Sequence, residues 1–371
     1  MLGTRLELHK ISSAALTMHP DLTLLGGRLL VIGPWPEPKG GVSIHVRRFC
    51  ERLKEGGASP GLIDESRVVK SGIPNLRQMG YLTYLRLLAA HTIIHVHSGN
   101  SWVRLAHVVA GRLLGRKVVL TVHSFRGSSA TRLLTWLAAY LSTRVIAVSA
   151  DIARSLHGQV LVAPAFIRPV ATELSASEQI RRRFDAWRSE GKIVMVANAS
   201  RIVEYKGHDL YGLDLLVELF ERPEIRSRYA CWFAISAGDP KQAEVVSAKE
   251  KLRELRAIDQ FEIDFSSCDF SGLIEISDIF VRPTRSDGDA ISIREALLLG
   301  RKVVASNCSV RPPSVILFES GNSEALADAL AQADTARTPP VSAEDYFWDV
   351  VECYQGLLEP CGASRSTAST G

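Results

Sequence analysis

No apolar stretch in this sequence reaches the roughly 18–20 residues that a helix needs to cross a bilayer. Six cysteines are scattered, with no C-x-x-C pair and no tight Cys/His cluster. That distribution argues against a structural zinc and a disulfide framework, and it fits a reducing, cytoplasmic location. The first 20 residues include Glu7 and lack the apolar core of a secretory signal, so we interpret residues 1–26 as an extension.

The 371 residues are enough for two ordinary domains, and 46% hydrophobic with 23% charged residues is the balance of a globular protein. The net charge of +4 conceals an asymmetry. Residues 1–150 hold 19 Lys and Arg against 7 Asp and Glu, a net of +12, whereas the remainder holds 25 against 33, a net of −8. A basic half indicates an anionic partner. An anionic membrane surface, a phosphorylated lipid and a nucleic acid are the candidates.

Apolar runs alternate with amphipathic segments, which is the signature of parallel sheets covered by helices on both faces. In the first half, strands are expected near 27–36, 92–99, 117–124 and 144–150, and helices near 40–57, 101–114 and 129–142. In the second half, strands are expected near 192–200, 230–238, 261–265, 278–284 and 302–307, and helices near 208–221, 241–256 and 290–299. The pattern predicts an α/β protein with two Rossmann-like domains facing across a central cleft.

The alternation breaks at "APAFIRPVATELSASE", which is rich in proline and small polar residues. We predict a first domain over 1–165, a linker over 166–190 and a second domain over 191–340. A helix over 341–358 could cross back to the first domain, and the tail at 359–371 is expected to be disordered.

Two cations follow the first apolar run of the second series, in "ANASRIVEYKGHD". Arg201 and Lys206 lie just past the expected carboxyl end of a strand, the edge at which open α/β sheets bind ligands. Both side chains suit phosphate oxygens. Gly207 lets the chain turn before a helix whose amino end adds a favourable dipole. The pair therefore predicts a diphosphate site that stabilises the leaving group, although R-x4-K-G alone also fits a solvated loop.

A second constellation is "SDGDAISIREALLLGRKVVAS", in which Asp287 and Glu295 are eight residues apart. Gly288 and Asp289 lead into an expected helix, and such a loop turns backbone N–H groups toward an anion or sugar. Glu295, in the first turns, can accept hydrogen bonds from vicinal hydroxyls such as those of a ribose. The same residues also fit a helix cap and a surface ion pair of Glu295 with Arg294 or Lys302.

Four histidines of the first half, at positions 45, 95, 97 and 123, are considered as functional residues. His95 lies inside an expected strand and is interpreted as buried, whereas His97 at the strand end is open to either interpretation. His45 either points at the cleft or packs. A metal site built on His95, His97 and His123 is disfavoured, because the histidines come from different strands with no acidic ligand nearby in sequence.

Taken together, these segments resemble the GT4-like retaining glycosyltransferases of GT-B fold. The second domain is similar through "SRIVEYKGHDLYGLDLL" and "DGDAISIREALLLGRKVVAS", and the first through "PKGGVSIHV", "IIHVHSG" and "VVLTVHS". The resemblance covers roughly residues 27–358. It implies an acceptor-binding first domain, a second domain that binds a nucleotide-diphosphate sugar, and no cofactor, because family members generally work without a bound metal.

The family's two glutamates, with seven residues between them, fall on Asp287 and Glu295, so the first acid is one methylene shorter here. The resemblance implies that Asp287 and His123 lie near the donor sugar, that Glu295 holds the ribose, and that Arg201 and Lys206 bind the diphosphate. The remaining candidate substrate-binding residues are Gly40, Gly41, Gly288, Asp289, Ala290 and Ile291. Two departures concern the sugar pocket: Ser124 replaces the usual glycine after the histidine, and "VAPAFIRP" replaces the family's frequent Asn-Gly.

The basic first half carries aromatic helical segments at 73–91, with Arg77, Tyr81 and Arg86, and from Trp102 and Arg104 onward. Such helices can lie on an anionic membrane, which predicts peripheral contact with the inner face of the cell membrane. Each also fits an ordinary helix packed on its sheet. Nucleic acid is disfavoured because the basic residues are dispersed and no aromatic RNP-like motif interleaves them.

The resulting hypothesis is a retaining glycosyltransferase of the EC 2.4 class. It would move a sugar from a nucleotide-diphosphate donor to a hydroxyl of a glycan or lipid-linked acceptor, in surface polysaccharide or lipopolysaccharide biosynthesis. A sugar-nucleotide epimerase shares the architecture but needs a protein acid/base that the pattern does not offer. A non-catalytic nucleotide-sugar-binding partner in a polysaccharide assembly complex is the third hypothesis, suggested by Asp287 in place of glutamate.

Overall fold

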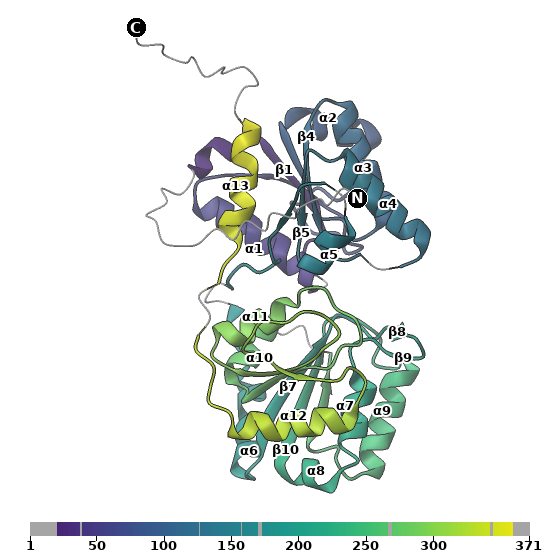
Figure 1. The fold of residues 1–371 in the computed structure, drawn as a ribbon, viewed down its shortest axis with the longest axis vertical. Helices are drawn as coiled ribbons and strands as arrows, with labels where there is room; N and C mark the ends of the chain where they lie inside the picture. Colours follow the sequence, from purple (N-terminus) through teal and green to yellow (C-terminus); the bar gives the residue numbers. More distant parts are fainter. Residues whose placement is uncertain are drawn as a thin grey trace, which may run out of the picture.

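A computed structural model describes residues 21–358 except 38, 126, 157, 170–172, 266–268 and 342–343. Figure 1 shows two domains one above the other. The expected tail at 359–371 and most of the extension at 1–26 lie outside the described residues. The extension's last part forms a 3-10 turn, η1 (Leu22–Leu25), in which Leu22 and Leu25 are buried against the first domain.

The first domain is a parallel sheet of six strands with the order β2-β1-β3-β4-β5-β6. The strands are β1 (Leu29–Gly33), β2 (Gly61–Asp64), β3 (Ile93–Val96), β4 (Lys117–Val122), β5 (Arg144–Ala147) and β6 (Val160–Val162). The helices are α1 (Gly41–Glu55), α2 (Tyr81–Ala90), α3 (Ser101–Leu113), α4 (Ser129–Leu141) and α5 (Ala150–Ser155).

The second domain is another six-stranded parallel sheet, ordered β11-β10-β7-β12-β13-β14. Its strands are β7 (Ile193–Ala199), β10 (Tyr229–Ile235), β11 (Phe261–Asp264), β12 (Ile279–Arg282), β13 (Lys302–Ser306) and β14 (Ile316–Phe318). Its helices are α6 (Glu178–Ser189), α7 (Leu213–Leu219), α8 (Pro223–Arg228), α9 (Ala243–Glu254), α10 (Phe270–Ile276), α11 (Ile291–Leu298) and α12 (Ser323–Thr335). The predicted α/β architecture is confirmed.

Alternate residues of the central strands enter different cores, because successive side chains of a strand point to opposite faces. In β1, Leu30 and Ile32 join one apolar cluster while Leu29 and Val31 join the cluster on the other face. Both faces are therefore buried, as continuous apolar runs predict for parallel sheets.

Each sheet has one point at which the strand order reverses. In the first domain the chain moves from β1 out to β2 and returns on the other side of β1 with β3. In the second it moves from β7 through β10 to β11 and returns beside β7 with β12. Ligands of open α/β sheets bind in the crevice at the carboxyl ends of such strands. The edges after β1, β3, β7 and β12 are therefore the places to examine.

Two helices at the boundaries of the second domain are assigned to a domain by their buried side chains. The last helix, α13 (Phe347–Leu358), buries Phe347, Val350 and Tyr354 in the first domain's core, so it crosses back as expected. Figure 1 shows this yellow helix on the purple domain. Within the predicted linker, α6 instead buries Phe184 and Trp187 in the second domain's core, which therefore begins before residue 191.

The helix expected over 208–221 starts later, because a hairpin precedes it. Strands β8 (Glu204–Tyr205) and β9 (His208–Asp209) pair antiparallel around a two-residue turn. Lys206 and Gly207 have φ of 55° and 82°, and positive φ at both central positions is the geometry of a type I′ hairpin turn. The cation Lys206 thus sits at the tip of a hairpin. Across the described part of the chain, no helix combines the length and apolarity that crossing a membrane requires.

Candidate functional site

The two sheets present their carboxyl edges to each other. Gly288, a candidate residue of the second domain, lies directly against the first domain. A Cβ placed on Gly288 would lie only 3.0 Å from the backbone carbonyl oxygen of His123, which follows β4. Ile291, at the start of α11, packs into the apolar cluster of the first domain. Residues assigned to one sugar donor from distant parts of the sequence therefore meet at one interface.

A cavity of about 200 Å³ lies at this interface. It is lined by Ser124, Phe125, Ser149, Asp151, Ile152 and Ser155 of the first domain, and by Ser286, Asp287, Gly288, Cys308 and Ser309 of the second. Ligand pockets for drug-sized molecules measure about 300–1,000 Å³, so this cavity fits a part of a nucleotide sugar rather than the whole. Binding of an entire donor would require the domains to separate.

Asp287 lies between two guanidinium groups that the sequence analysis did not single out. Its Oδ2 accepts a hydrogen bond from Arg282 Nε at 3.1 Å and one from Arg311 Nη1 at 3.3 Å. Thr284 Oγ1 donates to the same oxygen at 3.3 Å. Because Oδ2 is held by three donors, the aspartate is fixed at the cavity wall.

Arg282 connects the two strands at which the second sheet reverses. It ends β12, and its Nη1 donates to the side-chain oxygen of Asn198 in β7 at 3.0 Å. Its guanidinium also lies over the ring of Tyr211. Burial works to lower the pKa of Arg282, but Asp287, Tyr211 and Cys308 together raise it above the usual value. A buried arginine before a proline is hard to recognise in sequence, because its run "DIFVRPT" reads as an apolar strand.

Arg201 and Lys206 follow β7 at the same edge, and both side chains are exposed. Among the residues that the structure describes, neither forms an ion pair; Lys206 lies over the ring of its neighbour Tyr205. Exposed cations beside a switch point are available to an anionic ligand. The assignment of this pair to a diphosphate stays a prediction.

Gly40 and Gly41 begin α1 after β1, at the switch point of the first sheet. Gly40 has φ of −140°, which any residue can adopt. An added Cβ would come no closer than 4.0 Å to another atom at Gly40, and no closer than 3.9 Å, to Ile291, at Gly41. Neither strain nor crowding within the protein therefore explains these glycines, whereas close approach of a ligand to the helix amino end would.

Glu295 is buried and paired across the domain interface. Its Oε1 lies 2.6 Å from Arg48 Nη2, and Arg48 belongs to α1 of the first domain. Burial acts to lower the pKa of Arg48, but Glu295 and Glu173 raise it. The predicted role of Glu295 toward a ribose is not decided by this contact, which occupies one of its two oxygens. The predicted alternative pairing with Arg294 is not seen.

Arg294 instead pairs with Asp289, whose two oxygens it approaches at 3.0 and 2.8 Å. It also contacts Glu344, and it donates to Tyr346 Oη at 3.2 Å. Burial raises the pKa of Asp289. Arg294 thus ties Asp289, before α11, to the segment that crosses back, while Ala290, the residue before the helix, is buried.

Four histidine rings, those of His45, His95, His97 and His123, lie next to one another in the first domain. His97 Nδ1 is 3.1 Å from His123 Nε2, and His97 Nε2 is 3.2 Å from His95 Nδ1. His95 continues to Thr121 Oγ1 at 2.7 Å and contacts the Tyr354 hydroxyl. The expectation that His95 is buried is confirmed, and His97 is buried as well.

Burial lowers the pKa of all four rings, so they are neutral near pH 7. The pKa of His45 falls to about 4, and those of His95, His97 and His123 lie well below the usual value. Within the described residues, one nitrogen each from His45, His97 and His123 lie within 4.8 Å of one another, the spacing of a site that could hold a metal ion. The helix residue His45, rather than His95, completes this group.

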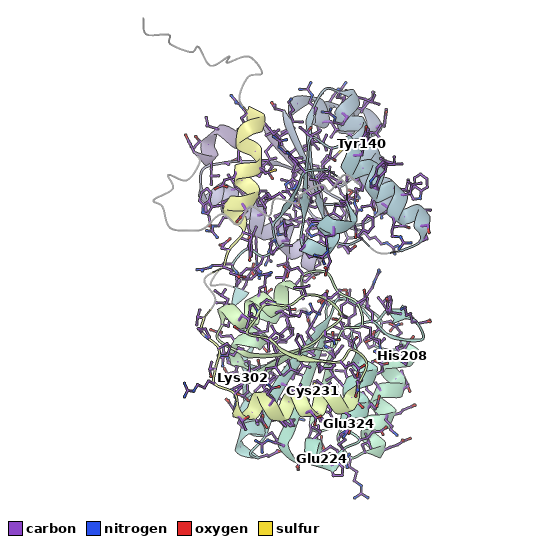
Figure 2. All side chains as sticks on the ribbon, in the orientation of Figure 1. Tyr140, His208, Glu224, Cys231, Lys302 and Glu324 are labelled. Atoms are coloured by element: carbon purple, nitrogen blue, oxygen red, sulfur yellow. The ribbon has the colours of Figure 1, made fainter. Side chains whose placement is uncertain are left out.

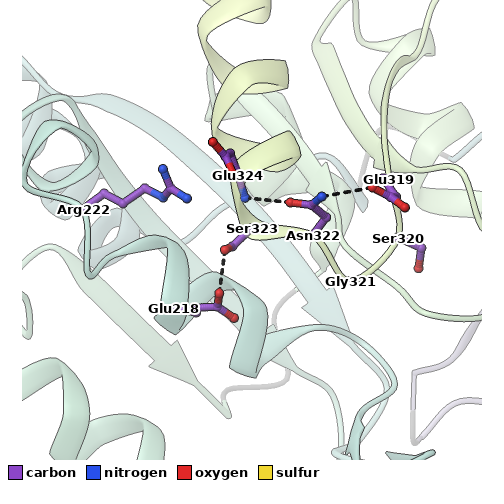
Figure 3. Close-up of a pocket in the computed structure, with 8 residues that line it drawn as sticks. All are labelled: Glu218, Arg222, Glu319, Ser320, Gly321, Asn322, Ser323 and Glu324. Atoms are coloured by element: carbon purple, nitrogen blue, oxygen red, sulfur yellow. Dashed lines mark hydrogen bonds between the residues drawn. The ribbon is translucent and has the colours of Figure 1, made fainter.

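A larger cavity of about 550 Å³ lies wholly in the second domain, between the ends of α7 and α12 (Figure 3). Its lining includes the carboxylates of Glu218, Glu319 and Glu324 but only one cation, Arg222. Ser323 Oγ donates to Glu218 at 2.6 Å. The larger cavity is lined by the second domain alone, whereas the interdomain cavity is lined by both domains and its Asp287 is paired with Arg282 and Arg311, so the interdomain cavity is the better candidate for the donor.

No protein-family model and no curated protein matches this sequence. Solved structures do match. A glycosyltransferase from Rickettsia africae ESF-5 has 15% identity and a TM-score of 0.67, covering 90% of this chain and 99% of that one. HepE from Anabaena, in complex with UDP-glucose, has 13% identity and a TM-score of 0.64, covering 88% and 94%. The lipopolysaccharide outer core galactosyltransferase WaaB has 12% identity and a TM-score of 0.55, covering 89% and 96%.

These matches cover almost the full length of each solved structure, so both domains and the connection between them are shared. The chain therefore has the GT-B fold, as the sequence resemblance predicted. At identities of 12–15% the likeness concerns the fold.

Proposed function

We propose that this protein is a retaining glycosyltransferase that uses a nucleotide-diphosphate sugar. The observation that carries the proposal is the approach of Gly288 to the backbone of His123, because the resemblance places both residues at one sugar donor and the structure brings them together between the domains, beside a cavity lined by Gly288 and Ser124. Similarity of fold to glycosyltransferases, one of them bound to UDP-glucose, supports it. The free cations after β7 provide the charge that such a donor needs.

In the proposed reaction, Arg201 and Lys206 bind the diphosphate, and the sugar lies near Asp287 and His123. The bond between the anomeric carbon and the diphosphate oxygen breaks, and the two cations stabilise the charge left on the phosphate. An acceptor hydroxyl then attacks the oxocarbenium-like carbon from the same face. Its proton passes to the departing phosphate oxygen, so the reaction needs no side-chain base. We expect no metal at the diphosphate.

The acceptor is proposed to be a glycan or lipid-linked hydroxyl on the side of the first domain. Residues 66–150 contain eleven Lys and Arg and no Asp or Glu. Helices α2, α3 and α4 of this region expose Tyr81, Trp102 and Tyr140, each by about 70% of its surface. Figure 2 shows Tyr140 on the first domain, remote from the labelled residues of the second. Arg104, expected on the same surface, is instead buried and donates to Ser98 O and Thr135.

Exposed aromatic rings in a region without acidic residues suit an anionic membrane surface. There the rings sit at the headgroup level, and each cation contributes roughly 1 kcal/mol to the free energy of membrane binding. We therefore propose a cytoplasmic protein that binds peripherally to the inner face of the cell membrane, where lipid-linked acceptors of surface polysaccharide are found.

Thermal denaturation with UDP-, GDP-, ADP- and dTDP-sugars tests the donor proposal, because a ligand that binds only the native state raises the melting temperature. One nucleotide is expected to stabilise the protein, and its diphosphate should be released only when acceptor is added. Conversion of the sugar without acceptor would indicate an epimerase instead. Stabilisation with no release under any condition would indicate a non-catalytic partner, and no stabilisation by any nucleotide sugar would contradict the proposal.

A further inference from the structure

Three histidines from separate elements converge in the first domain. His45 lies on α1, His97 follows β3, and His123 follows β4. Their ring centroids form a nearly equilateral triangle with sides of 5.2, 5.4 and 5.4 Å. Because three different elements deliver one ring each, this arrangement depends on the folded sheet and not on local sequence.

The triangle has the dimensions of a metal site. A Zn²⁺–imidazole bond measures about 2.0–2.1 Å, so two nitrogens bound to one tetrahedral ion lie roughly 3.3 Å apart. His97 Nδ1 and His123 Nε2 are already 3.1 Å apart. The three candidate ligand atoms lie within 4.8 Å of one another, so a shift of about 1.5 Å closes the set around an ion.

One of the three rings also carries an unsatisfied nitrogen. His45 is buried, and its Nδ1 has no hydrogen-bond partner among the described residues. Leaving a buried polar atom unsatisfied costs about 1–3 kcal/mol, and native proteins retain few such atoms. A metal ion would satisfy this nitrogen.

The surroundings resemble those of a supported ligand set. The ring of His97 that offers Nδ1 to the cluster is held at Nε2 by His95, and His95 is held in turn by Thr121. Such outer partners fix the orientation of a metal-binding imidazole. Three nitrogens without a carboxylate favour Zn²⁺ and its neighbours in the transition series over Mg²⁺ or Ca²⁺, which require oxygen ligands.

We propose that His45, His97 and His123 bind a transition-metal ion, with Zn²⁺ as the representative case. This site is carried by the first domain, whereas Arg201 and Lys206 belong to the second, so the metal would not replace them at the diphosphate. Three protein ligands leave a fourth position for water or an oxygen from the cavity. Occupancy would hold the His123 ring away from a bound sugar, so metal and donor would compete.

The test uses the full chain without a histidine tag, stripped with a chelator and then titrated with Co²⁺ and Zn²⁺. Wild type is expected to bind one equivalent of Co²⁺ with the visible absorption of a tetrahedral nitrogen site, and Zn²⁺ should displace it. Elemental analysis after gel filtration gives the stoichiometry. His123→Gln should weaken Zn²⁺ binding at least tenfold, and His45→Gln should do the same.

Two further variants separate a metal site from adventitious binding. His95→Gln leaves all three ligands in place and should weaken Zn²⁺ binding about 10–100-fold, the range for outer partners of metal ligands. His208→Gln removes an exposed histidine of the second domain, labelled in Figure 2, and should leave the affinity unchanged. Circular dichroism confirms the fold of each variant. Absence of tetrahedral Co²⁺ absorption in wild type, or equal Zn²⁺ affinity in wild type and folded His123→Gln, would overturn the proposal.

Discussion

The guanidinium of Arg48 lies 2.6 Å from the carboxylate of Glu295, and both side chains are buried between the domains. Arg48 also donates to Glu173 in the interdomain connection, to the carbonyl of Ile167 and to Ser271 of α10. One arginine therefore holds the first domain, the connection and the second domain together. Its partners carry two negative charges, and Arg47 supplies the second positive charge through Glu173.

Replacing Arg48 by Met should destabilise the protein strongly, because the buried carboxylate of Glu295 would lose its partner and Glu173 would keep only Arg47. Breaking one side of a buried ion pair costs about 3–5 kcal/mol, and urea denaturation measures the loss in free energy of unfolding. Arg182→Met is the matched control, since its pair with Glu178 is exposed and should contribute at most about 1 kcal/mol. Equal effects of the two substitutions would show that Arg48 does not hold the domains.

Arg201→Ala and Lys206→Ala should each fold normally and lose affinity for a nucleotide diphosphate. Both side chains are exposed, so stability should change by less than about 0.5 kcal/mol. A hydrogen bond to a charged group contributes about 1.5–3 kcal/mol, equivalent to a roughly 10–150-fold loss of affinity by calorimetry. Arg253→Ala, an exposed arginine late in α9, is the control. Wild-type affinity and turnover in Lys206→Ala would remove this residue from the phosphate site.

Gly288→Ala should push the two domains apart. The added Cβ would lie 3.0 Å from the His123 carbonyl oxygen, a backbone atom that cannot move away by rotating. The contact must open by a few tenths of an ångström, so we expect lower turnover and a lower melting temperature. Gly356→Ala, where an added Cβ meets nothing within 4 Å, should instead stabilise α13 by about 0.5–1 kcal/mol. An unchanged melting temperature and full activity in Gly288→Ala would show that the contact does not matter.

Vesicle flotation tests the membrane surface. The protein should float with anionic vesicles at low salt, float less at high salt, and not bind neutral vesicles, because screening weakens exposed charges. Trp102→Ser and Tyr140→Ser together should reduce binding without unfolding, since both rings are exposed. Val310→Ser, at an exposed apolar residue of the second domain, should have no effect. Failure of wild type to bind either vesicle type would end the membrane proposal.

The alternation of apolar and amphipathic segments was sufficient to predict the fold, because buried parallel strands read as continuous apolar runs. The alternation does not predict elements that are short or that lack a periodic apolar pattern. Strand β14 has three residues, and α12 is rich in alanine, which carries little periodic signal. Helix α6 was placed in a linker because prolines precede it, whereas its aromatic face packs in the second core.

Local sequence determined the strands, the helices and the glycine-rich starts of α1 and α11, because these depend on periodicity and on backbone freedom within a few residues. It also placed Arg201, Lys206 and Asp287 after strands. Only the tertiary structure decided that Glu295 faces Arg48, that Arg282 and Arg311 hold Asp287, and that His45 joins His97 and His123. Those contacts join residues from different strands and domains, and strand order, which sets them, is a property of the whole sheet rather than of any segment.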